Sequence, residues 1–346
     1  MTTTPTLVRF SSPSGEDRYS LGHPLLDRYL EFVAGRARPN TLRAAAFDLK
    51  TFFSVIDKDP ADVVATDVFD FLAQQRGDRK VVRMADRESG VSARTLARRL
   101  SSLSGLYAYL MARDDTALRS NPVPRGLATR SGGRLRMAPL VRVPRTLPKI
   151  LAPGEADALL SSLRRHRDRA MVLAMLLGGL RRCEVLGLRL QDVRVGDRAL
   201  FVNEGKGGHQ RVVPVANPFF TAVGDYLRTE RPKDAGTDRV FLVLKGPRRG
   251  RPLSAEGVDE ILAGARIRAR LEHGTCHELR HTCLTRLREA GMALEAVQAQ
   301  AGHRSIESTR VYLHLTNDWL AGEYHRASGL IDRAARELTA MQEVTA

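Results

Sequence analysis

The segment 277–281 is the first place in the sequence where residue types and spacing could do chemistry. It reads HELRH and so matches H-E-x-x-H. On a helix this pattern places two imidazoles on one face, where they can hold Zn²⁺ beside a glutamate that acts as general base. A catalytic zinc site needs a third protein ligand, and neither Glu295 nor His303 extends the motif as zinc peptidases require. A zinc peptidase is therefore kept as the alternative from another class of protein.

The same segment has a second interpretation, in which its side chains bind an anion. His277 and Arg280 stand three positions apart, so they share a helix face. A histidine and an arginine that point to one place suit an anionic oxygen better than a metal ion, because a guanidinium is not an ordinary metal ligand. This interpretation predicts further cationic side chains at the same site, and the sequence supplies three: Arg181, Lys206 and His303.

The surroundings of these cationic residues indicate how each could be positioned. Arg181 follows an apolar helix, and Glu184, three residues later, is placed to hold its guanidinium. Lys206 lies between two glycines at the tip of an expected β-hairpin. His303 follows a glycine at an expected helix end, and Tyr312 comes nine residues later as a candidate nucleophile.

Each of these residues also has an ordinary structural explanation. Arg181 could be a surface charge that the helix dipole favours, and Lys206 a solvated turn residue. His303 could simply end a helix. Tyr312 could be a half-buried core tyrosine, with Tyr324 as a rival nucleophile. Against this, all the pieces fall into one order along the chain.

In that order the motifs resemble the signature of the tyrosine recombinase, or phage integrase, family. They are G-L-R-x-x-E at 179–184, G-K-G at 205–207, H-E-L-R-H-T at 277–282 and G-H at 302–303, followed by Tyr312. Each motif is weak alone, but together they are specific, and the resemblance covers the whole second domain. The first domain resembles the family's core-binding domain through N-T-L at 40–42, D-L at 48–49 and F-F at 52–53.

The resemblance implies a role for each residue. Tyr312 attacks the scissile phosphorus and leaves a 3′-phosphotyrosyl bond and a free 5′-hydroxyl. A phenol has an ordinary pKa of about 10, so His277 serves as general base, while Lys206 serves as general acid on the leaving oxygen. Glu184 supports Arg181. The non-bridging oxygens are bound by three cationic residues: Arg181, Arg280 and His303. Neither a metal, nor ATP, nor any other cofactor is required.

The composition limits the class of protein. The 346 residues suggest two domains, and the net charge of +16 favours a polyanionic partner, most commonly nucleic acid. The three cysteines form no C-x-x-C pattern, and no stretch is apolar for the roughly 20 residues that a membrane helix needs. We therefore expect a cytoplasmic, nucleoid-associated protein of the bacterial or phage type, with no signal peptide and no membrane partner.

Composition and periodicity along the chain predict five regions. They are a flexible tail at 1–20, a helical SAM-like core-binding domain at 21–113, a basic linker rich in Pro, Gly and Arg at 114–146, a catalytic domain at 147–330 and a tail at 331–346. Strand-like runs at 199–202, 211–215 and 240–244 predict a three-stranded sheet. We expect a mainly α fold with this small sheet, in the family's two-domain architecture that clamps DNA.

The expected partner is double-stranded DNA, with a homotetramer on synapsed DNA and often a monomer in solution. A second recombinase or a directionality factor is left open, as is docking of the C-terminal tail on a neighbouring protomer. A type IB topoisomerase and a catalytically inactive DNA-binding relative are the remaining alternatives. The sequence leaves the biological use open among integration, excision, transposition, inversion and dimer resolution, and it does not reveal the DNA target.

Overall fold

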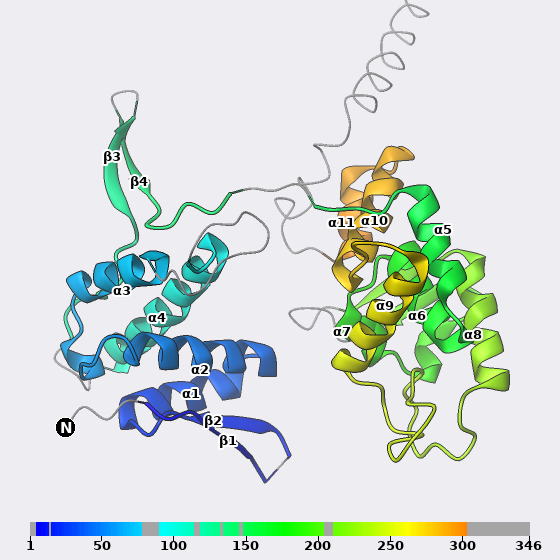
Figure 1. The fold of residues 1–346 in the computed structure, drawn as a ribbon, viewed down its shortest axis with the longest axis horizontal. Coiled ribbons are helices and arrows are strands. Elements are labelled where there is room, and N and C mark those ends of the chain that lie inside the picture. The colour runs from blue at the N-terminus through cyan, green and yellow to red at the C-terminus, as the bar shows by residue number, and fades with distance from the viewer. Residues whose placement is uncertain are drawn as a thin grey trace, which may run out of the picture. The chain divides into compact units, whose positions relative to one another are not determined.

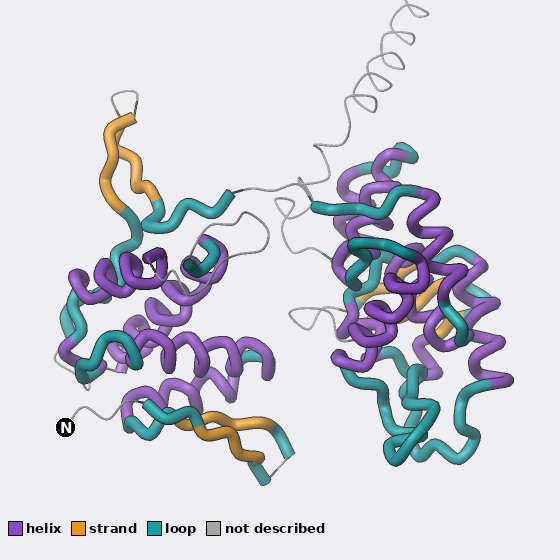
Figure 2. The backbone as a smooth tube through the Cα atoms, viewed as in Figure 1, coloured by secondary structure: helices purple, strands orange, loops and turns teal. Residues whose placement is uncertain are grey.

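The chain forms two compact units, residues Met1–Arg145 and Thr146–Ala346. The computed structural model describes residues 5–13, 15–77, 90–113, 118–131, 134–144, 148–203 and 210–302. Helices dominate both units, with short strands between them (Figures 1 and 2). The expectation of a mainly α fold with a small three-stranded sheet is confirmed. Within the described ranges, no helix has the length and apolar character needed to cross a membrane.

The first unit is built around four helices, as their apolar periodicity predicts. They are α1 (Pro24–Arg36), α2 (Pro39–Phe53), α3 (Ala65–Gly77) and α4 (Ala93–Arg113), with a short 3₁₀ turn at Pro60–Asp62. Leu100, Leu103 and Leu110 on one face of α4 are buried against the other helices. The carboxylate of Asp48 on α2 accepts hydrogen bonds from Arg98 and Ser102 on α4, at 2.5 and 2.8 Å. Apolar packing and this buried polar contact thus hold α2 and α4 side by side.

The N-terminal residues differ from the expected loose tail. Strands β1 (Val8–Ser11) and β2 (Asp17–Ser20) form an antiparallel hairpin in which Val8 pairs with Ser20. Tyr19 and Leu21 belong to the core of the unit, exposed by only 7% and 1%. The turn needs Gly15, whose φ of +78° favours glycine. The expectation of a flexible tail over 1–20 is therefore wrong for residues 8–11 and 17–20, because strands this short carry little periodic signal.

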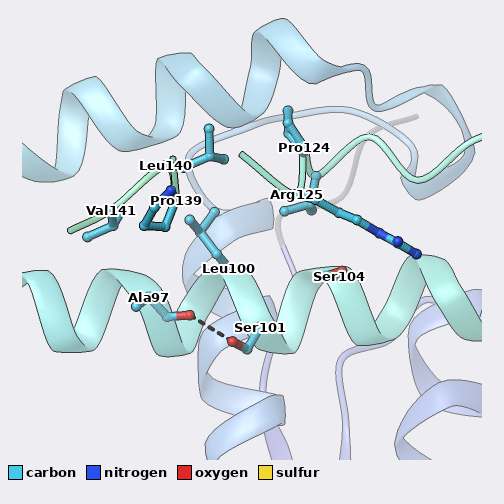
Figure 3. Close-up of a pocket in the computed structure, with 10 residues that line it drawn as sticks. Ala97, Leu100, Ser101, Ser104, Pro124, Arg125, Pro139, Leu140 and Val141 are labelled. Carbon is cyan, nitrogen blue, oxygen red and sulfur yellow. Dashed lines mark hydrogen bonds between the residues drawn. The ribbon is translucent and has the colours of Figure 1, made fainter. Parts of the chain in front are cut away.

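The basic segment expected to be a linker also carries structure of its own. Strands β3 (Leu127–Ser131) and β4 (Arg134–Ala138) pair antiparallel. After β4, Leu140 and Val141 pack over the α4 residues Ala97 and Leu100 (Figure 3). The chain that follows the first four helices is thus anchored on α4 and is not a plain tether over its whole length.

The second unit surrounds one very apolar helix, α6 (His166–Gly178), most of whose residues are buried. The other helices in the described part of this unit are α5 (Pro153–Ser162), α7 (Arg182–Gly187), α8 (Asn217–Thr229), α9 (Ala255–Ala269), α10 (Cys276–Glu289) and α11 (Leu294–Ala301), with a 3₁₀ turn at Leu190–Asp192. Helices α8 and α10 both pack on α6. The sequence also predicts a helix over 305–313, and this segment lies outside the described residues.

The sheet of this unit is antiparallel, in the order β5-β6-β7. Strands β6 (Ala199–Val202) and β7 (Arg211–Pro214) form the expected hairpin, and β5 (Val193–Arg194) is the third strand. Residues 240–244 were expected to be that third strand, which is wrong. They are held instead by one isolated bridge, between Leu242 and Pro252, and by the hydroxyl of Tyr226, which donates to the carbonyl of Val240 at 2.9 Å.

Candidate active site

The start of α10 shows what the H-E-x-x-H segment does structurally. Thr275 caps the helix, and its hydroxyl accepts from the backbone N–H of Glu278 at 3.3 Å. The Glu278 carboxylate accepts in return from the backbone N–H groups of Gly274 and Thr275, both at 2.8 Å. Partial burial opposes ionisation, but these N–H donors outweigh it and lower the pKa of Glu278. The carboxylate is committed to a capping box, which argues against its use as a zinc-site general base.

The two histidines of the segment contact each other. Their Nε2 atoms lie 2.8 Å apart, so one ring donates a hydrogen bond to the other. Burial and, to a smaller extent, the neighbouring His277 lower the pKa of His281 to about 4. His281 is therefore neutral near pH 7 and forms a fixed polar neighbour for His277. Among the described residues, no three His, Cys, Asp or Glu side chains gather as a metal ion would require.

A buried carboxylate organises the arginines. Glu184 on α7 is 3% exposed. Its oxygens accept from Arg181 (backbone N and Nη1, both 2.8 Å) and from Arg211 at the start of β7 (Nη1 3.0 Å, Nη2 2.9 Å). The guanidinium of Arg280 on α10 lies 3.9 Å away. Burial opposes ionisation of Glu184, but Arg211 and then Arg181 outweigh it and lower its pKa to about 2.

The same arginines cap the end of α11. Arg211 Nε donates to the carbonyl of Gln300 at 3.2 Å, and Arg280 Nη2 to that of Ala301 at 2.6 Å. Arg181 Nη2 donates to the carbonyl of Gly302 at 3.3 Å. The last carbonyls of a helix lack partners within it and carry partial negative charge, so guanidinium donors stabilise them. Three elements far apart in the sequence thus meet at one carboxylate and one helix end.

The structure brings together three of the residues predicted from the sequence. Arg181, Glu184 and Arg280 form the cluster just described, and Arg280 also donates to the carbonyl of Gly179 at 2.5 Å. His277 lies three positions before Arg280 on α10. The other predicted site residues lie outside the described ranges, as does the rival Tyr324: Lys206, His303 and Tyr312. Lys206 belongs to the segment that joins β6 to β7, and His303 directly follows the cap of α11.

Sequence reasoning missed Arg211. It is an unremarkable first residue of a strand, and no motif or spacing in the chain singles it out. Its side chain is only 12% exposed, since it lies between Glu184 and the end of α11. Gln300 was missed as well. Its amide donates to the carbonyls of Gly178 and Pro214, both at 3.0 Å, and so ties α11 to α6 and β7.

Comparison with known proteins decides the family. The model of the "Phage integrase family" matches residues 149–318, and that of the "Phage integrase, N-terminal SAM-like domain" matches residues 26–114. A tyrosine recombinase XerD from Mycobacterium tuberculosis (strain CDC 1551 / Oshkosh) is 31% identical over 316 residues, covering 83% of this chain and 92% of that protein. This chain belongs to the tyrosine recombinase family. Another relative, a tyrosine recombinase XerD from Listeria monocytogenes serotype 4b (strain F2365), is 29% identical over 314 residues, which cover 84% of this chain and 94% of that protein.

Solved structures of tyrosine recombinases share the fold. A Tn1549 transposon integrase in complex with transposon right end DNA has a TM-score of 0.65 at 19% identity, covering 88% of this chain and 99% of that chain. The XerH site-specific recombinase bound to palindromic difH substrate has a TM-score of 0.61 at 21% identity, and the match covers 85% of this chain and 83% of that chain. The predicted family is confirmed, and this tyrosine recombinase is a site-specific recombinase that acts through a tyrosine.

Proposed function

We propose that this tyrosine recombinase cuts double-stranded DNA by attack of the Tyr312 oxygen on the scissile phosphorus. The new bond is a 3′-phosphotyrosyl ester, and the bond that breaks releases a 5′-hydroxyl. Rejoining reverses the step, because the 5′-hydroxyl of another strand attacks the ester and frees the tyrosine. The ester conserves the energy of the broken bond, so the proposal includes no metal, ATP or other cofactor.

The observation that carries this proposal is the cluster of arginines at Glu184. Arg181 and Arg280 converge from α7 and α10, and Arg181 is held on both carboxylate oxygens. A guanidinium fixed in this way before the substrate arrives stabilises charge on phosphate oxygens without reorganising during the reaction. We assign the non-bridging oxygens to Arg181, Arg280 and His303, and the support of Arg181 to Glu184.

The remaining roles concern protons. The phenol of Tyr312 must lose a proton, which we assign to His277, whose ring is held against the neutral His281 at 2.8 Å. The leaving 5′-oxygen must gain a proton, which we assign to Lys206 in the segment between β6 and β7. The order of these residues along the chain, together with the family of the second unit, supports both assignments.

Double-stranded DNA as substrate is supported by two observations. The net charge of +16 favours a polyanion. The integrase and XerH structures with the same fold were solved in complex with DNA. Because exchange joins two duplexes, we propose a homotetramer on synapsed DNA, used for integration, excision, transposition or dimer resolution. Docking of residues 331–346 on a neighbouring protomer is part of the same proposal, and deletion of those residues should then abolish synapsis.

The decisive experiment traps the covalent intermediate. The purified protein is incubated in excess EDTA with sheared DNA of its own source, SDS is added, and the DNA that stays attached to protein is sequenced. Adducts should form without metal, should vanish in Tyr312→Phe and should persist in the matched control Tyr324→Phe. Adducts that persist in Tyr312→Phe, or that require a divalent metal, would refute the assignment.

A further inference from the structure

We propose that Arg211 is a positioning residue of the recombinase, which fixes Glu184 and the end of α11 so that Arg181 is held where phosphate charge develops. This inference rests on the proposed function and deepens it. Arg211 belongs to none of the motifs that carry the family resemblance. It stands in the middle of the cluster, with contacts to both the carboxylate and the helix end.

The hydrogen bonds of Arg211 fix the orientation of the carboxylate. Its Nη1 and Nη2 donate to the two oxygens of Glu184, at 3.0 and 2.9 Å. A bidentate pair of this kind restrains the plane of the carboxylate as well as its position. The same oxygens hold the guanidinium and the backbone N–H of Arg181. The orientation of Arg181 therefore depends on a carboxylate that Arg211 orients.

Burial makes this dependence strong. The side chain of Glu184 has no exposed surface, and that of Arg211 is 12% exposed. Water is therefore a poor substitute for the lost donors if Arg211 is removed. The carboxylate would turn toward its remaining partners, and Arg181 would follow it. A displacement of about 1 Å at a catalytic group can cost on the order of 100-fold in rate.

The third hydrogen bond of Arg211 reaches the end of α11. Its Nε donates to the carbonyl of Gln300 at 3.2 Å. A Cβ added to Gly302 would lie 2.8 Å from Nη1 of Arg211, so the guanidinium lies directly against this glycine. The chain leaves α11 at Gly302, immediately before His303. Arg211 thus fixes the point from which the chain continues toward His303 and Tyr312.

Two routes could connect Arg211 with the reaction, and the contacts favour one of them. Through Glu184 and the end of α11, Arg211 acts on groups assigned to the non-bridging oxygens. Through its strand β7, it could act on Lys206 and hence on the leaving oxygen. We propose the first route, because the hydrogen bonds that the Arg211 side chain makes with described residues go to Glu184 and Gln300.

Substrate chemistry separates the two routes. The trapping experiment provides the target sequence, and three nicked suicide substrates are made with it. They differ only at the scissile position, which is a phosphodiester, a methylphosphonate or a linkage with a 5′-bridging sulfur. The methylphosphonate replaces a charged non-bridging oxygen by a methyl group and lessens the need for arginines. The bridging sulfur departs without a proton and removes the need for a general acid.

We expect Arg211→Gln to slow adduct formation on the phosphodiester by roughly 10- to 100-fold relative to wild type. The ratio of the wild-type rate to the Arg211→Gln rate should fall toward one on the methylphosphonate and stay large on the sulfur substrate. Arg211→Lys keeps the charge but cannot make the bidentate contact, so it should show the same pattern. DNA affinity and melting temperature are measured alongside for each variant.

The matched control is Arg167→Gln. Arg167 is also buried, and it donates to the carboxylate of Asp168 and the carbonyl of Leu242, both at 2.8 Å, but it lies outside the cluster. A loss of rate for Arg211→Gln that is equal on all three substrates, or that tracks only the melting temperature, would overturn the proposal. Recovery on the sulfur substrate alone would overturn it in favour of Lys206. Wild-type protein that forms no adduct would instead contradict the proposed function.

Discussion

Replacement of Glu184 by glutamine tests the arginine cluster most directly. The substitution keeps the shape of the side chain and removes the charge that three guanidinium groups surround. The pKa of Glu184 falls from its ordinary value of 4.5 to about 2. Since one pKa unit corresponds to about 1.4 kcal/mol, this shift implies about 3 kcal/mol of stability at pH 7. We expect Glu184→Gln to lose about 3 kcal/mol of stability, because removal of the buried carboxylate charge leaves the guanidinium groups around it uncompensated.

The pH dependence gives the prediction a second, independent part. The pKa of Glu184 is lower in the folded chain than in the unfolded chain, so its contribution is complete above the ordinary pKa and declines as the pH falls toward 2. The difference between wild type and Glu184→Gln should therefore shrink from about 3 kcal/mol at pH 5 to about 1 kcal/mol at pH 3.

Urea unfolding followed by circular dichroism between pH 7 and pH 3 measures this difference. Asp259→Asn is the control, because the exposed Asp259 pairs with Arg182 in a contact that should contribute less than about 1 kcal/mol. The reasoning is refuted if Glu184→Gln is as stable as wild type at pH 7. It is equally refuted if the loss is the same at pH 3 as at pH 7.

Three further predictions concern neighbouring features. Gly302→Ala should slow adduct formation at least 10-fold, because a Cβ would displace Arg211 and φ is +60°, whereas Gly224→Ala, with open space around it, should not; unchanged cleavage in Gly302→Ala would contradict the geometry. Thr275→Ala should cost about 1 kcal/mol in urea unfolding through loss of the N-cap, and no loss would show that the cap is not needed. Between pH 6.5 and pH 4, wild type should lose more stability than His281→Gln, because the unfolded chain protonates His281 at a higher pH than the folded chain does. Equal losses of stability in the two proteins would contradict the lowered pKa of His281.

The sequence predicted the parts of the fold that carry a periodic apolar signal. Helices α4, α6 and α10 lie within one residue of the spans that the sequence predicts for them, which are 92–113, 167–177 and 277–290. Apolar side chains repeat at helical spacing along α4, whereas α6 is marked by a continuous apolar run. The hairpins β1–β2 and β3–β4 were not predicted. Their four- and five-residue strands are rich in Arg and Ser, and the alternation of apolar and polar residues, as in VRFS and RLRMA, lasts for only two repeats.

The candidate site was predicted only where a contact is local or a motif carries it. Glu184 stands three residues from Arg181, so their pairing follows from helical geometry alone. The pairing of Glu184 with Arg211 spans 27 positions and depends on the register of β6 against β7. The capping of α11 by three arginines depends on tertiary packing of α7, β7 and α10. No spacing rule reaches contacts of this kind.

The composition of the cluster has a consequence for the balance of charge during the reaction. Three guanidinium groups against one carboxylate leave two net positive charges beside the end of α11. A phosphodiester carries one negative charge, and its pentacovalent transition state carries two. Under the proposed assignment of the non-bridging oxygens to these arginines, the bound substrate compensates half of the excess positive charge, and the transition state compensates all of it. Such a cluster is electrostatically complementary to the state that the reaction passes through rather than to the DNA that it binds.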